Sequence, residues 1–96
     1  MTIEYSNRAV GDLRKLGDSS LQYGEAVAIA VEARLREILD HVATYPEAAE
    51  QISERPGVHV VPLVRYPYKI FYRVLKDRIR ILHIRHTSRK PWTARR

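Results

Sequence analysis

Apolar residues are densest in two runs near the end of the chain, at 68–75 and 79–86. Both runs are rich in β-branched and aromatic residues, and the short polar break at 76–78 separates them. Apolar positions within the runs do not recur every 3.6 residues, so the pattern predicts two strands joined by a tight turn. Strand alternation directs Tyr72 toward a core and places Lys69 and Arg73 on the opposite, partly open face.

Helical spacing dominates the first half of the chain. Ser6 is a plausible N-cap for a helix at Arg8–Leu16, and Gly17 is expected to end that helix. A longer apolar stripe, with steps of three and four residues, predicts a second helix from about Ser20 to Tyr45. Such a stripe could also form a coiled-coil surface, but it spans fewer than four heptads, which favours an intramolecular core.

The remaining segments complete an α+β pattern. Thr2–Tyr5 alternates like an edge strand, and Pro46 ends the second predicted helix. After a turn at Arg55-Pro56-Gly57, Val58–Val64 is predicted to be a strand, with Pro62 at an edge or a break. We therefore expect a single domain over residues 1–96, with an antiparallel sheet of about four strands and an N-terminal helical hairpin packed on one face.

Positive charge is concentrated in the second half. Residues 1–48 hold five Lys/Arg and eight Asp/Glu, whereas residues 49–96 hold twelve and three. The second half should therefore attract nucleic acid or an acidic protein, although a merely solvated surface is the alternative. The chain has no cysteine, no long apolar run and no signal-peptide pattern. These features exclude a disulfide scaffold and predict a soluble, cytoplasmic protein without a membrane partner.

The candidate site is a set of cationic residues on or beside the last strands. If the strands pair about residues 76–78, Lys69 lies near the His83–His86 end and Arg73 lies near Arg80 or Leu82. Such a cluster suits an anionic partner, because guanidinium groups match phosphate geometry. The predicted target-binding or anion-binding residues are Arg65, Lys69, Arg73, Arg85, Arg89, Lys90 and Trp92. Trp92 could stack on a base, although packing on the core to hold the tail is the favoured interpretation.

The sequence gives weaker evidence for catalysis or cofactor binding. A ribonuclease could use a histidine as general base and Arg or Lys to stabilise the phosphate. His83 and His86 should face opposite ways, which disfavours a shared metal site or an acid–base pair, and His41 and His59 are assigned to surface or structural roles. The chain has no HExxH, glycine-rich phosphate loop, CxxC or carboxylate pair, so no metal and no cofactor is expected.

Residues 56–92, PGVHVVPLVRYPYKIFYRVLKDRIRILHIRHTSRKPW, resemble the C-terminal half of RelE/ParE-type toxins. The resemblance is carried by a YxxFYRV-like strand at Tyr68–Val74, an acidic turn at Asp77, and a strand ending in His86-x-x-Arg89. With the helical hairpin, it covers nearly the whole chain. It implies a compact α+β toxin of a type II toxin–antitoxin module, of the kind that stabilises plasmids, neutralised by a small, often acidic antitoxin segment that wraps around it.

The resemblance leaves two targets open. ParE-type members poison DNA gyrase without known catalytic residues, whereas RelE-type members cleave mRNA on the ribosome. In position, Lys69 and Arg73 match the basic residues of the strand, and Arg85, His86 and Arg89 match the terminal set. The chain has no tyrosine after Tyr72, and its His-x-x-Arg ending is closer to the ParE type, so gyrase poisoning is expected.

The alternative is a ribosome-dependent endoribonuclease with His86, Arg85 and Arg89 as catalytic residues. A basic nucleic-acid-binding module without toxicity is disfavoured, because no recognised nucleic-acid-reading motif is present.

Overall fold

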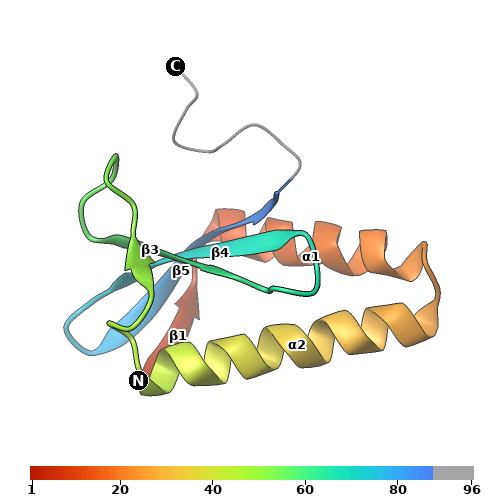
Figure 1. The fold of residues 1–96 in the computed structure, drawn as a ribbon, viewed down its shortest axis with the longest axis horizontal. Coiled ribbons are helices and arrows are strands. Elements are labelled where there is room, and N and C mark those ends of the chain that lie inside the picture. The colour runs from red at the N-terminus through yellow and green to blue at the C-terminus, as the bar shows by residue number, and fades with distance from the viewer. Residues whose placement is uncertain (88–96) are drawn as a thin grey trace.

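The computed structural model describes residues 1–87 of the chain, which form an α+β fold as predicted (Figure 1). Two helices follow a first short strand, and four further strands complete the sheet. The elements are β1 (Thr2–Tyr5), α1 (Asn7–Leu21), α2 (Glu25–Thr44), β2 (Glu50–Gln51), β3 (Val58–Pro62), β4 (Tyr68–Val74) and β5 (Arg78–His86). None of the described helices is long and apolar enough to span a membrane.

The sheet has five strands in the order β1-β5-β4-β3-β2. β1 runs parallel to β5, whereas the other neighbouring strands are antiparallel. The sequence pattern predicted about four antiparallel strands, so it missed one strand and the parallel pairing. The missed strand is β2, whose two exposed residues pair with His59 and Val60 and leave no apolar pattern to recognise.

The helices begin and end differently from the prediction. Ser6 is the N-cap of α1 and accepts a hydrogen bond from the Ala9 N–H at 3.0 Å, as expected. Gly17 does not end this helix, which continues to Leu21; Leu16 and Ser20 are buried, and this packing offsets the poor helix propensity of glycine. The two helices are separated at Gly24, which has φ +109° and precedes the first residue of α2.

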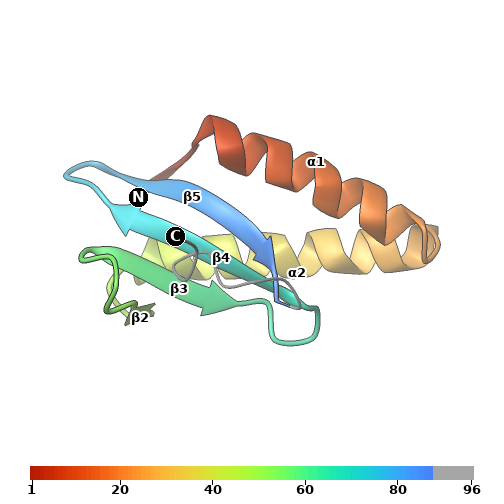
Figure 2. The ribbon, with the colours of Figure 1, turned by 90° about the horizontal axis from the view of Figure 1, so that it is seen from above.

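The core lies between the two helices and one face of the sheet. In Figure 2, β3, β4 and β5 lie in front of α2, and α1 runs beside β5. The buried cluster joins Leu16 of α1 and the α2 stripe to the inner positions of β4 and β5. Its fully buried sheet members include Ile70, Tyr72, Ile79 and Ile81. The Tyr72 hydroxyl, facing the helices as predicted, donates a hydrogen bond to the Pro46 carbonyl at 2.8 Å.

The outer edge of β5 is covered by two different elements. β1 pairs only with residues 78–81. Beyond them, the Ser6 hydroxyl donates to the Leu82 carbonyl at 2.9 Å, and an Asp12 carboxylate oxygen accepts from the Ile84 N–H at 3.0 Å. The start of α1 therefore replaces a strand along this edge and satisfies its backbone groups with side chains.

A bulge in β5 lies next to this edge. Phe71 pairs with His83, whereas the next residue, Tyr72, pairs with Ile81, so Leu82 is an extra residue in β5. A bulge of this kind bends the strand and redirects the side chains that follow it. His83 and Arg85, together with Phe71 and Lys69 on β4, consequently share the face of the sheet that points away from the helices.

Candidate functional site

Cationic side chains line the sheet surface opposite the helices, here named the open face. They come from β4 and β5 and form two like-charge pairs across the strands, Arg73 opposite Arg80 and Lys69 opposite Arg85. Both pairings agree with the prediction from the sequence. Like charges directly opposite each other destabilise a sheet unless an anion or water compensates them. On β4 and β5, the open face therefore consists of Lys69, Phe71, Arg73, Arg80, His83 and Arg85.

The Arg73–Arg80 end of the open face is compensated within the chain. Arg73 Nη1 donates to the Pro56 carbonyl at 3.2 Å. Arg80 and Arg78 both form ion pairs with the carboxylate of Glu4 on β1. These contacts fix the side chains and neutralise part of their charge.

The Lys69–Arg85 end, here named the outer end, is more positive. Arg85 is only 9% exposed, and its Nη1 donates to the His86 carbonyl at 3.3 Å. Lys69 is partly buried, and Arg65 is exposed in the loop between β3 and β4 at this same end. Among residues 1–87, no carboxylate forms an ion pair with Lys69 or Arg65. Three of the predicted site residues thus gather here.

His83 occupies a buried position beside the open face. Its Nδ1 lies 2.6 Å from Asp12 Oδ2, and its ring stacks on Phe71 at a centroid distance of 5.9 Å. Burial lowers the pKa of His83; the hydrogen bond and charge of Asp12 oppose this effect, and the charges of Arg8 and Arg85 add to it. The lowered pKa favours the neutral ring, and the close contact joins His83 Nδ1 to the Asp12 carboxylate.

Sequence reasoning missed the contribution of α1 to this cluster. Arg8 Nε lies 3.2 Å from His83 Nδ1, and Asp12 is one helical turn further along α1. An i,i+4 pair of opposite charges on one helix was a visible signal. Nothing in the sequence showed that the pair would meet β5, because the contact joins residues more than seventy positions apart.

His86 lies on the other side of the sheet from Arg85. Its ring packs edge-on against Tyr68 at a centroid distance of 5.2 Å. With Tyr66 and Tyr68 it lines a pocket of about 390 Å³ whose other wall is the tip of the helical hairpin. The expected separation of His83 and His86 is thus observed. Arg89, Lys90 and Trp92 lie outside the described residues.

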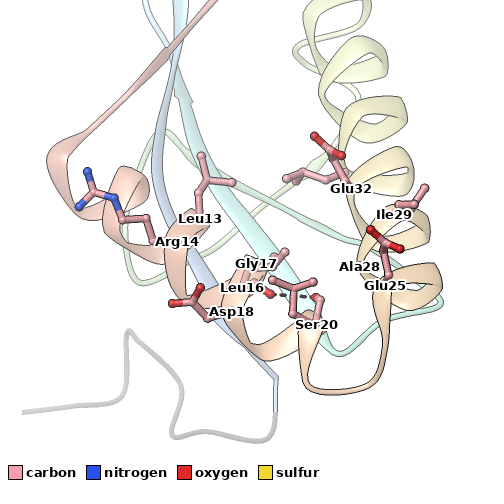
Figure 3. A pocket seen from close by; sticks show the side chains of 12 residues that line it. Leu13, Arg14, Leu16, Gly17, Asp18, Ser20, Glu25, Ala28, Ile29 and Glu32 are labelled. Carbon is pink, nitrogen blue, oxygen red and sulfur yellow. Dashed lines mark hydrogen bonds between the residues drawn. The ribbon is translucent and has the colours of Figure 1, made fainter.

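A second surface, here named the hairpin groove, lies between α1 and α2 (Figure 3). Its volume is about 670 Å³. The apolar lining includes Leu21 and Ile29, which are 58% and 61% exposed. The lining consists of Leu13, Arg14, Leu16, Gly17, Asp18, Ser20, Leu21, Glu25, Ala28, Ile29, Glu32 and Leu35. The sequence pattern predicted that the second helix begins at about Ser20, so that it would include Leu21. Leu21 is instead the last residue of α1 and lines the hairpin groove.

Metal binding has no support within residues 1–87. No group of three or more His, Asp or Glu side chains in this part of the chain is arranged to hold an ion.

The fold defines the general class of the protein. A chain in the structure of the chromosomal ParDE toxin–antitoxin system from P. aeruginosa is 26% identical, with a TM-score of 0.76 over 90% of this chain and 95% of that one. The isolated E. coli RelE toxin is 20% identical, with a TM-score of 0.68 over 93% of this chain and 86% of that one, which shows a shared fold. The structure therefore has the fold that these two toxin-system structures share.

The particular family follows from the sequence match. The model of the ParE toxin of the type II toxin–antitoxin system parDE matches residues 3–91. Because this match spans nearly the whole chain, the chain belongs to the ParE toxin family and is the toxin component of a type II module. The expected RelE/ParE membership is confirmed. No curated protein sequence matches the chain.

Proposed function

We propose that this toxin arrests growth by poisoning DNA gyrase in the cytoplasm. The observation that carries the proposal is the match to the ParE toxin family over residues 3–91. The likeness to a chain of the P. aeruginosa ParDE system, over 90% of this chain, supports the same branch. Gyrase poisoning requires a binding surface, and the open face provides one.

The arrangement of the histidines supports binding rather than RNA cleavage. A general base must reach the proton that it abstracts, directly or through one water. His86 packs against Tyr68 on the helix side, away from Arg85. His83 is buried, and its Nδ1 is engaged by Asp12 and Arg8. Within residues 1–87, neither ring therefore shares an exposed surface with the basic side chains that would stabilise a phosphate.

We also propose that a small antitoxin neutralises the toxin by covering two surfaces. The open face suits an acidic segment, because its outer end carries Lys69, Arg65 and Arg85. The hairpin groove suits apolar anchors, because Leu21 and Ile29 are exposed in it. The carboxylates that line the groove favour an antitoxin segment with Lys or Arg beside its apolar anchors.

The test is induced expression without antitoxin, scored in parallel for DNA-damage signalling and for transcript cleavage. We expect growth arrest with DNA damage and intact mRNA. Rapid, ribosome-dependent mRNA cleavage without DNA damage would overturn the gyrase proposal and support the endoribonuclease alternative. Co-expression of the antitoxin is the control and should restore growth.

A further inference from the structure

The outer end of the open face has the shape and charge of a polyanion contact. Lys69 and Arg85 lie opposite each other on neighbouring strands, about 5 Å apart across the sheet. Arg73 lies four residues along β4 from Lys69, which corresponds to roughly 14 Å of strand. The cations therefore form a strip rather than a pocket for one small ion. A strip of this kind fits the repeated charges of a phosphate backbone.

The loop beside this strip carries backbone strain. Val64 has φ +72° and is 72% exposed. A β-branched residue is rarely found in this left-handed region, and an exposed side chain offers little packing to compensate it. The loop is held by the Arg34 Nε–H, which donates to the Leu63 carbonyl at 3.0 Å. Strain maintained in this way is found at functional segments, and the exposed Arg65 is the next residue of this loop.

We propose that the outer end, with Arg65 and Lys69 as its exposed cations and Arg85 supporting the positive potential, binds the phosphate backbone of duplex DNA directly. Among the described open-face residues, the aromatic Phe71 is 5% exposed and offers no platform for stacking unpaired bases. The chemistry therefore favours the backbone of a duplex over a single strand. The choice of DNA rests on the proposed function, since gyrase acts on duplex DNA.

Direct DNA binding gives the open face a second role. The toxin would contact the DNA that gyrase holds, and not only the enzyme. An acidic antitoxin segment on the open face would compete with that DNA. Neutralisation would then follow from charge competition at one surface.

The experiment measures fluorescence anisotropy of a labelled 30-base-pair duplex of mixed sequence, titrated with the full chain in the absence of gyrase. Salt is varied from 50 to 300 mM. Each phosphate neutralised contributes about −0.9 to the slope of log K against log salt concentration. Arg65→Gln/Lys69→Gln should make the slope shallower by about 2. Neither substitution removes a side-chain hydrogen bond or ion pair within residues 1–87, and circular dichroism verifies the fold.

The matched control is Lys15→Gln/Arg36→Gln, which removes the same charge from the helices outside the groove lining. We expect this variant to keep the slope of the unmodified chain. The proposal is overturned if the unmodified chain fails to bind at 50 mM salt. It is also overturned if both variants make the slope shallower by the same amount, because binding would then depend on net charge alone. Tighter binding of a single-stranded RNA of equal length would also overturn it. Because gyrase is absent, DNA binding can fail here while gyrase inhibition persists.

Discussion

Gly57 shows how a single residue shapes the open face. It has φ +82°, and a Cβ at this position would lie 2.7 Å from Arg73 Nη1. The turn before β3 and the position of the Arg73 guanidinium therefore both require glycine. Gly17 lies in the middle of α1 and has an ordinary helical backbone. A Cβ added at this position would point into open space.

These two glycines predict opposite effects of the same substitution. Gly57→Ala should lower the free energy of unfolding by about 1–2 kcal/mol, because the left-handed conformation is unfavourable for alanine and Arg73 must move. Gly17→Ala should raise it by up to about 1 kcal/mol through helix propensity. Urea unfolding of both variants measures the difference. Equal stability of Gly57→Ala and the unmodified chain would contradict this account of the turn.

His83 predicts a pH dependence of stability. Burial is the largest cause of its lowered pKa, so the folded state binds its proton less readily than the unfolded state, whose ordinary value is 6.5. The contribution of the buried His83 ring to the free energy of unfolding is fully present above about pH 6.5. It is lost as the pH falls through the folded-state pKa. His83→Gln, which keeps a donor for Asp12, should flatten this fall. Unfolding midpoints between pH 5 and 8 measure it; an unchanged profile would exclude His83 as its source.

At the scale of elements, the apolar runs and helical stripes predicted most of the fold. Long-range contacts account for the differences. Gly17 remains helical because its neighbours Leu16 and Ser20 pack inward, and β2 forms only because β3 offers it a partner. The proximity of Lys69 and Arg85 could be predicted by pairing the last two strands about the turn between them. The role of Asp12 could not be predicted, because it depends on α1 meeting β5.

The hairpin groove is an element-scale feature with its own prediction. Leu21→Ala/Ile29→Ala should weaken antitoxin binding about tenfold or more, because exposed apolar anchors carry much of the energy of such interfaces. Val10→Ala/Tyr45→Ala, which truncates two exposed hydrophobic residues outside both proposed surfaces, is the control and should bind normally. Isothermal titration with the purified antitoxin compares the pairs. Unchanged affinity of the groove variant would remove the groove from the proposed interface.

At the scale of the whole molecule, charge and shape divide the toxin into two surfaces. Basic residues collect on the open face, and the hairpin groove on the helical side carries Asp18, Glu25 and Glu32. This division orients the toxin toward polyanions. Under the proposed function, the target and an acidic antitoxin segment would both contact the open face. If the target binds the open face as proposed, toxicity depends on the outer end of that face.

The most direct measurement is the amount of DNA that purified gyrase leaves covalently cleaved, with ATP and supercoiled plasmid, after addition of the toxin. The unmodified chain and Lys15→Gln/Arg36→Gln should both raise it. With Arg65→Gln/Lys69→Gln, the increase in cleaved DNA should be at least several-fold smaller. The contradictory result is no effect of the unmodified chain on gyrase, together with cleavage of ribosome-bound transcripts by the same preparation.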